Sequence, residues 1–228
     1  MAPKIFRFCP SENFSFHFSF FKIVRGDGQY MYDDEGNKYL DCINNVAHVG
    51  HCHKHVVAQT CKQIGLLETN SRFLHDNLVL YSKRITEKMP QGLEMTFYTN
   101  SGSESNDLAI RIARKATNAY DIIILDHAYH GHLTTLVDIS PYKFNHPGGE
   151  GKKDWVHMVP TPDSYRGKYR SKDYDQEQLA HLYAQEVIDA VERAEANGRR
   201  ICLFLAESLQ SCGGQIVYPK NYLKKVYG

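Results

Sequence analysis

Four consecutive apolar residues, Ile122–Leu125, constrain the fold of this chain more than any other feature. An uninterrupted run of this length is typical of a strand buried on both faces of a parallel sheet. A helical pattern over Glu104–Ala116 precedes it. A second helical pattern over Asp175–Asn197, stopped by Gly198, leads into another apolar run, Ile201–Ala206. Helices alternating with buried strands predict an α/β fold with a mainly parallel sheet.

The composition excludes several classes of protein. With 42% hydrophobic residues the 228-residue chain can form a core, and a net charge of +1 argues against a nucleic-acid partner. No apolar stretch is long enough to cross a membrane. The six cysteines form no C-x-x-C pair, which favours free thiols in a reducing compartment over a disulfide framework. We therefore expect a protein that is not secreted.

Weaker patterns complete the outline. Residues 1–21 form an atypical segment, in which phenylalanines alternating with polar residues predict a half-buried strand. Tyr30–Leu40 predicts a hairpin, and two helices are expected from about Lys54 and over Leu74–Ile85. Met95–Thr99 predicts a short strand. The helix after it is expected to face inward with Leu108, Ala109, Ile112 and Ala113 and outward with Arg111, Arg114 and Lys115. Residues 140–172 are expected to be irregular. A further helix is expected to start near Asn221.

The segment Thr99–Glu104 is the first candidate site. A strand leads into a glycine turn and then directly into a helix, whose first backbone N–H groups can bind an anion. Gly102 would let a phosphate approach the backbone, and Ser103 adds a hydroxyl donor. The same residues also fit an ordinary helix N-cap, in which the helix dipole favours a carboxylate in the first turn.

Two further polar clusters follow the buried strands. Asp126–His132 follows the first apolar run; in it Tyr129 offers a flat face to a ring, and His130 is a candidate acid, base or ring neighbour. Glu207 follows the second run. Because parallel strands end at one edge of a sheet, Ser103, Tyr129 and Glu207 are expected to converge there. Each cluster alone could simply cap the sheet.

The histidine-rich loop suggests a different chemistry. His48, His51, His53 and His55, with Cys52, could be zinc ligands, but they lack a second separated pair of ligands, so solvated histidines at a loop-to-helix junction are favoured. A Rossmann dinucleotide site is set aside, because no G-x-G-x-x-G follows the first strand.

The longer motifs resemble a known family. TNSGSESNDLAIRIAR and LDHAYHGH are similar to the class III aminotransferases. DCINNVAHVGHCH, TNSRFLHDN, PTPDSYRGKYR and AESLQSCGGQI look like its alanine–glyoxylate aminotransferase 2-like subgroup, which includes phospho-lyases of ethanolamine phosphate and 5-phosphohydroxy-lysine. The resemblance runs from about Lys22 to Tyr227. It implies fold type I of the pyridoxal-phosphate (PLP) enzymes, in an incomplete form: residues 22–80 in a small domain and its connection, and 81–228 in part of the large PLP-binding domain.

The resemblance also assigns residues to the cofactor. It implies that Gly102 and Ser103, with Ser101, hold the PLP phosphate. Tyr129 stacks on the pyridine ring, with His130 beside it, and Glu207 orders the site. Tyrosine stands where many relatives carry phenylalanine, a change that preserves stacking.

The catalytic groups are expected elsewhere. The resemblance implies that the aspartate facing the ring nitrogen and the lysine that anchors PLP both lie beyond Gly228. Lys220, Lys224 and Lys225 come too soon after Glu207 to replace that lysine. No catalytic residue is therefore assigned in this chain, which is expected to be a fragment or a truncated product without turnover of its own.

Three functional hypotheses remain open. The subgroup motifs favour a PLP-dependent lyase that converts a phosphorylated amine to an aldehyde, ammonia and phosphate. The alternatives are an ω-transaminase using glyoxylate or pyruvate, and a catalytically inactive truncated product that pairs with a full-length subunit. The resemblance further implies a small-molecule amine substrate, a homo-oligomer (dimer or higher), and a mitochondrial or cytoplasmic location.

Overall fold

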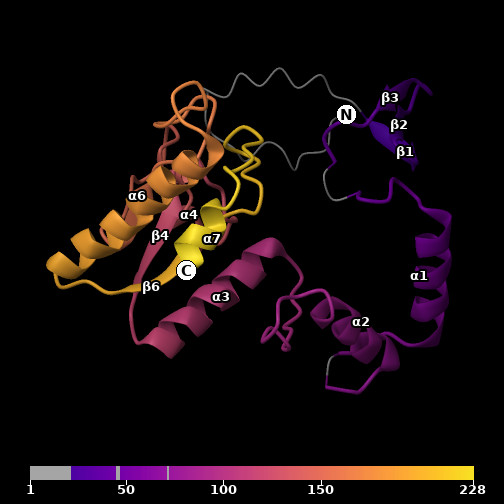
Figure 1. Cartoon of the computed structure of the whole chain (residues 1–228). Helices are drawn as coiled ribbons and strands as arrows, with labels where there is room; N and C mark the ends of the chain where they lie inside the picture. Colours follow the sequence, from indigo (N-terminus) through magenta and orange to yellow (C-terminus); the bar gives the residue numbers. More distant parts are fainter. Residues whose placement is uncertain (1–21, 45–46, 71) are drawn as a thin grey trace. The chain divides into compact units, whose positions relative to one another are not determined.

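A computed structural model describes residues 22–44, 47–70 and 72–228. The chain divides into two compact units, one ending at Arg84 and the other running from Ile85 to Gly228 (Figure 1). The boundary expected from the sequence, between residues 80 and 81, lies four residues before this division. The phenylalanine-rich strand expected before residue 21 lies outside the described residues.

The first unit contains a small antiparallel sheet and two helices. Its strands are β1 (Ile23–Asp27), β2 (Tyr30–Asp33) and β3 (Lys38–Leu40), and β2 with β3 forms the expected hairpin. At the hairpin turn the Asp33 carboxylate accepts bonds from the backbone N–H of Glu35 (3.1 Å) and of Asn37 (2.8 Å). Helices α1 (Lys54–Leu66) and α2 (Asp76–Thr86) confirm the two helical patterns, and the last turn of α2 crosses the unit boundary.

The histidine-rich loop is attached to this sheet through one of its members. His51 pairs by backbone with Gly28, and its Nε2 lies 2.6 Å from a carboxylate oxygen of Asp41. A Cβ on Gly26 would come within 2.6 Å of the His51 Cβ, so only glycine allows this approach. Within the described ranges no three histidine, cysteine or acidic side chains gather closely enough to hold a metal ion. His51 thus has a structural role here.

The second unit is built on a parallel sheet in the order β5-β4-β6. The central strand β4 (Asp121–Leu125) is buried along its whole length between β5 (Val156–Val159) and β6 (Ile201–Leu205). The expected α/β architecture with a buried parallel strand is confirmed.

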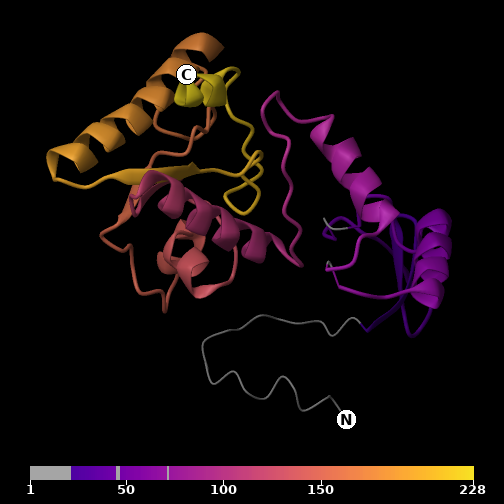
Figure 2. The ribbon, with the colours of Figure 1, turned by 90° about the horizontal axis from the view of Figure 1, so that it is seen from below.

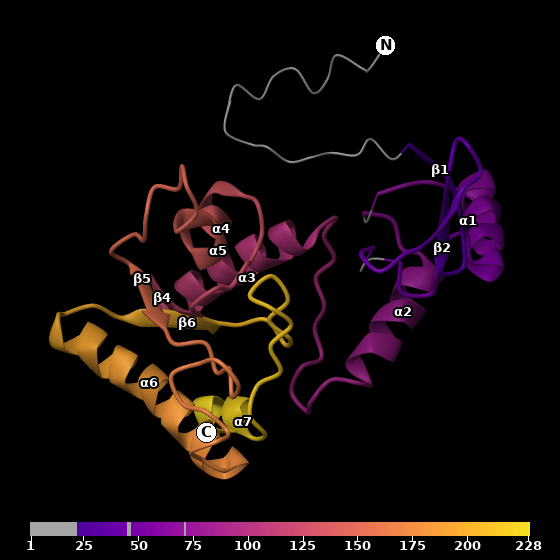
Figure 3. The same cartoon turned by 90° about the horizontal axis from the view of Figure 1, so that it is seen from above.

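Helices cover both faces of this sheet (Figures 2 and 3). Successive residues of β4 point to opposite faces, so Ile123 and Leu125 face one core while Ile122 and Ile124 face the other. The first core is closed by α6 (Gln176–Ala196) and α7 (Tyr222–Tyr227). The second is closed by three helices: α3 (Gly102–Thr117), α4 (Thr134–Asp138) and α5 (Pro141–Phe144). No described helix is both long and apolar enough to cross a membrane.

Three expectations about this unit were wrong, wholly or in part. Met95–Thr99 is not a strand, because no neighbouring strand in the described part of the chain pairs with its backbone. The expectation for α3 was wrong only in part: Arg111 and Lys115 are exposed as expected, but the buried residue is Ile110, and Ile112 is 46% exposed. Arg114, expected to point outward, is half-buried and stacks on the Tyr120 ring. The region 140–172 is not wholly irregular, since it contains α5 and β5.

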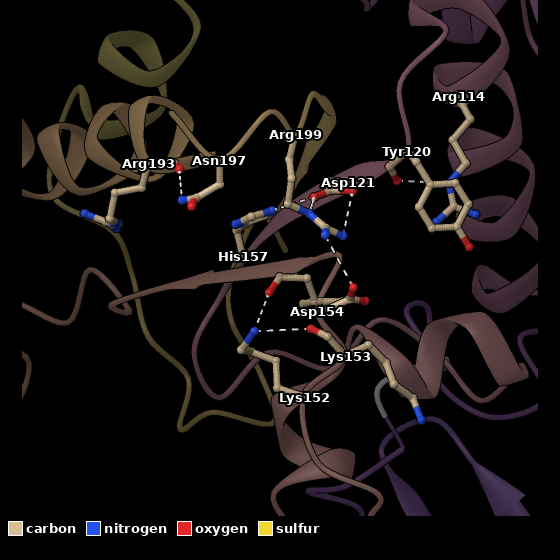
Figure 4. Close-up of polar contacts among 11 residues, drawn as sticks. Arg114, Tyr120, Asp121, Lys152, Lys153, Asp154, His157, Arg193, Asn197 and Arg199 are labelled. Carbon is tan, nitrogen blue, oxygen red and sulfur yellow. Dashed lines mark hydrogen bonds and ion pairs between the residues drawn. The ribbon is translucent and has the colours of Figure 1, made fainter. Parts of the chain in front are cut away.

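A buried carboxylate ties the starts of the three strands together (Figure 4). Asp121 begins β4, and its side chain is only 6% exposed. It bonds to His157 Nε2 of β5 at 2.8 Å and to the Arg199 guanidinium just before β6. Arg199 also reaches Asp154 at 3.3 Å. Burial opposes the charge of Asp121, but the bonds from Arg199 and His157 outweigh it and hold its pKa below the usual 3.8.

We predict that Asp121→Asn lowers the free energy of unfolding at neutral pH by roughly 1–3 kcal/mol, because it leaves the partly exposed Arg199 and His157 side chains without the buried carboxylate that they contact. A carboxylate whose folded pKa is depressed stabilises above its unfolded pKa and loses this contribution as pH falls through the folded value. The deficit of the variant should therefore shrink below about pH 4. Urea titrations across pH measure this. Asp173→Asn, at a half-exposed aspartate, is the control, and equal losses in the two variants would refute the prediction.

Candidate functional site

The N-terminus of α3 presents free backbone donors to open space. The N-cap Ser101 is extended, and its Oγ accepts the backbone N–H of Glu104 at 3.1 Å; the Glu104 carboxylate accepts the N–H of Asn100 at 2.6 Å. The helix begins at Gly102, two residues before the helical pattern expected over Glu104–Ala116. The N–H groups of Gly102 and Ser103 have no acceptor inside the helix. No heavy atom lies within 4 Å of the point where a Cβ of Gly102 would stand.

Ser103 joins this helix start to the loop that follows β4. Its Oγ accepts the backbone N–H of His132 at 3.0 Å, and its own O–H proton remains available to a ligand. Between them stands Gly131, with φ of +139°, where a Cβ would come within 2.6 Å of the Ser103 Oγ. Glycine is required here both for the backbone conformation and for the close approach.

Glu207 holds the same loop from the other side. One carboxylate oxygen accepts the N–H of Tyr129 at 3.0 Å, and the other accepts the N–H of Ser211 at 3.1 Å. The side chain thereby links the loop after β4 to the loop after β6. Ser103, Tyr129 and Glu207 therefore converge at the carboxyl edge of the sheet, as the sequence predicts. Their use by a single ligand stays a prediction.

Two residues of this network were missed by sequence reasoning. The fully buried Ser140 accepts the N–H of His130 at 2.9 Å and donates to the carbonyl of Leu136 at 2.6 Å. Asn106 donates from Nδ2 to the carbonyl of His130 at 2.7 Å. Asn106 follows Ser103 by three residues on α3 and so shares its face, a signal that could have been used. The Ser140–Pro141 pair looked like an ordinary loop, and nothing in its spacing indicated this role.

His130 is held in the neutral form. Its side chain is 5% exposed, and burial lowers its pKa to about 4. Nε2 has no hydrogen-bond partner among the described residues. At neutral pH it therefore carries no positive charge toward a ligand. Of the three candidate roles of His130, which are acid, base and ring neighbour, the last agrees best with a buried, neutral imidazole.

Tyr129 carries the aromatic face of the site. Its ring makes an edge contact with Tyr142, with centroids 5.9 Å apart and planes at 70°, and Lys143 Nζ lies 5.7 Å from its centroid. The ring is half-buried, so one part remains accessible. With the helix start beside it, the arrangement can bind a flat ring bearing an anionic group.

Comparison with known proteins identifies the family. The family described as "Aminotransferase class-III" matches residues 13–227 of this chain. The chain belongs to the class III aminotransferase family. The match begins eight residues before the position where the sequence analysis ended its atypical segment, so residues 13–21 fall within it.

Individual relatives narrow the comparison. The chain is 55% identical over 206 residues to alanine–glyoxylate aminotransferase 2-like of Drosophila melanogaster, covering 90% of this chain and 42% of that protein. It is 43% identical to ethanolamine-phosphate phospho-lyase homolog 1 of Caenorhabditis elegans, covering 90% and 45%. A phospholyase from Arthrobacter, solved with phosphoethanolamine, shares the fold with a TM-score of 0.79 and 32% identity, covering 90% and 47%. The chain thus spans less than half the length of these relatives.

We predict that Ser140→Ala lowers the free energy of unfolding by about 1–3 kcal/mol, because the buried N–H of His130 loses its acceptor. Urea unfolding followed by circular dichroism measures the change. The control is Ser171→Ala, at an exposed serine, which should alter stability by less than about 0.5 kcal/mol. A Ser140 variant as stable as this control would show that the bond does not contribute.

Proposed function

We propose that this chain forms the cofactor-phosphate side of a PLP-dependent class III enzyme. In this proposal the N–H groups of Gly102 and Ser103, with the Ser103 hydroxyl, bind the PLP phosphate at the start of α3. Ser101 shapes that start as its N-cap. Tyr129 lies against the pyridine ring with the neutral His130 beside it.

One observation carries the proposal. The anion-binding helix start and the aromatic loop are joined directly, by the 3.0 Å bond between Ser103 Oγ and the N–H of His132. This bond fixes the distance between a phosphate at α3 and a ring at Tyr129. The open space over Gly102 leaves room for the phosphate. The residues present thus fit the two ends of PLP.

Bound PLP supplies an electron-withdrawing ring that accepts electron density from the carbon beside the substrate nitrogen. The residues of this chain would do the positioning. Glu207 and Ser140 hold the loop backbone, so that the Tyr129 ring is kept in place before any ligand arrives. The neutral His130 adds no charge that would compete for the phosphate. The lysine anchor and the ring-nitrogen aspartate remain expectations from the family resemblance.

For the reaction we favour a lyase that acts on a phosphorylated amine, such as phosphoethanolamine or 5-phosphohydroxy-lysine, and gives aldehyde, ammonia and phosphate. The phospho-lyase names of the worm and Arthrobacter relatives support it. Transamination is the second candidate, because the fly relative, at 55% identity, carries the aminotransferase name. Phosphate release, compared with amino transfer to glyoxylate in the protein extended to its relatives' length, separates the two.

We further propose that the enzyme is a homo-oligomer. None of the residues of α1 is buried, and apolar side chains of the first unit such as Leu66 and Leu74 are 72% and 89% exposed. Apolar surface on this scale favours burial against a partner. A mitochondrial or a cytoplasmic location is consistent with the relatives, since the human alanine–glyoxylate aminotransferase 2, 32% identical, is named mitochondrial.

The proposal predicts that Gly102→Ala weakens binding of pyridoxine 5′-phosphate about tenfold or more. A methyl group in the open space over Gly102 would keep the phosphate from the helix start, where each hydrogen bond to the anion is worth ~1.5–3 kcal/mol. Pyridoxine 5′-phosphate lacks the aldehyde of PLP, so it tests the phosphate and ring contacts without an anchoring lysine. Its fluorescence, titrated with the 228-residue chain, gives the dissociation constant. The new methyl group meets no protein atom, so folding should be unaffected.

Gly65→Ala is the matched control, because Gly65 also has open space around its Cβ position and lies in α1. This variant should bind as the unsubstituted chain does. Unchanged binding by Gly102→Ala, with both proteins folded, would contradict the assignment of the helix start to the cofactor phosphate.

A further inference from the structure

Lys143 stands next to the aromatic face of the site. It lies in the short helix α5, and its Nζ is 5.7 Å from the Tyr129 ring centroid and 5.5 Å from that of Tyr142. The side chain is half-buried. A cation in this position lies beside whatever ring or substrate contacts Tyr129.

The backbone that carries Lys143 is fixed to the site. Pro141 and Phe144 of α5 are buried, and Phe144 belongs to the core that α3, α4 and α5 close. The N–H of Tyr142 bonds to the carbonyl of Ala128 at 3.2 Å, one residue before Tyr129. The position of the ammonium relative to the loop is therefore limited mainly by the rotamers of the lysine itself.

The charge of Lys143 is not balanced by a carboxylate. The two acidic residues nearest to it in sequence are occupied: Asp138 and Glu150 lie 3.7 and 2.6 Å from Lys153. Both oxygens of Glu207 accept backbone N–H groups instead. In the described part of the chain, no acidic oxygen lies within ion-pair distance of Lys143.

Lys143 also acts on the loop after β6. Burial raises the pKa of the Cys212 thiol, the charge of Glu207 raises it further, and the charge of Lys143 opposes both. The positive charge of Lys143 therefore acts on the loop that carries Glu207 and Cys212 as well as on the Tyr129 ring. An anion between these loops would gain its attraction.

We propose that Lys143 binds the phosphate group of the substrate amine, and so selects phosphorylated amines; this inference rests on the proposed PLP function. The ammonium is a compact point charge that can pair with a phosphate dianion, which carries more negative charge than a carboxylate. The start of α3 holds a second anion, so the site separates the cofactor phosphate from the substrate phosphate.

The test compares three variants of the 228-residue chain: Lys143→Met, Lys143→Arg and, as control, Lys115→Met at an exposed lysine of α3. Calorimetry gives the dissociation constants of phosphoethanolamine and of ethanolamine, with excess pyridoxine 5′-phosphate present to occupy the α3 start. Lys143→Met should weaken phosphoethanolamine binding about tenfold, the loss expected for one charge-assisted bond. Lys143→Arg should stay within about threefold of the unsubstituted chain, and ethanolamine should not respond to any variant.

Several results would overturn the inference. The inference fails if the unsubstituted chain does not detectably bind phosphoethanolamine, or if Lys143→Met binds it as tightly as the unsubstituted chain does. It also fails if Lys143→Arg binds phosphoethanolamine as weakly as Lys143→Met. If Lys143→Met instead weakens pyridoxine 5′-phosphate binding, the lysine serves the cofactor and the inference also fails. Failure of the proposed function is distinguishable, because pyridoxine 5′-phosphate alone would then not bind the chain, whatever residue stands at position 143.

Discussion

After β4 the chain leaves the buried sheet, and the residues that follow have no neighbouring strand to pair with. Their backbone N–H and C=O groups still need hydrogen-bond partners. Side chains provide them. Glu207, Ser140 and Ser103 accept the N–H groups of Tyr129, His130 and His132 in turn, and Asn106 donates to a carbonyl between them. Every feature of the candidate site depends on this loop being held in one conformation.

This constraint explains how distant segments come to share one site. The four side chains come from α3, from the N-cap of α5 and from the loop after β6, which surround the carboxyl end of β4. Each bond that fixes the loop also fixes the element that provides it. The start of α3, proposed here to bind phosphate, the aromatic ring of Tyr129 and the cation at Lys143 are therefore positioned together. At the opposite end of the strands, Asp121 ties β4 to its neighbours in a similar way.

Much of this arrangement was readable from the sequence, because its causes are local. Ile122–Leu125 is apolar throughout, which is typical of a buried strand, and the capping residues Ser101 and Asp175 are of types that favour helix starts. The convergence of Ser103, Tyr129 and Glu207 followed from one rule about parallel strands. The remaining features depend on partners far along the chain. The role of Ser140 could not be predicted without knowing that the backbone N–H of His130 lies within hydrogen-bond distance of its hydroxyl.

The misread elements have the same origin. Met95–Thr99 has the composition of a strand, but a strand forms only where a neighbour pairs with it. The β5 residues Val156–Val159 were passed over because polar and glycine-rich residues surround so short a run. In α3 several apolar positions compete, and only packing in the core shared with the sheet and with α4 decides that Ile110 faces inward.

The central claim is that side chains of this chain hold the loop after β4 before any ligand binds. Amide hydrogen exchange of the ligand-free chain, resolved by residue with NMR, tests it directly. The account predicts that the amides of Tyr129, His130 and His132 exchange slowly, with protection approaching that of β4. Exchange as fast as in the exposed turn around Gly148 would mean that the loop is open without a ligand, and would contradict the account.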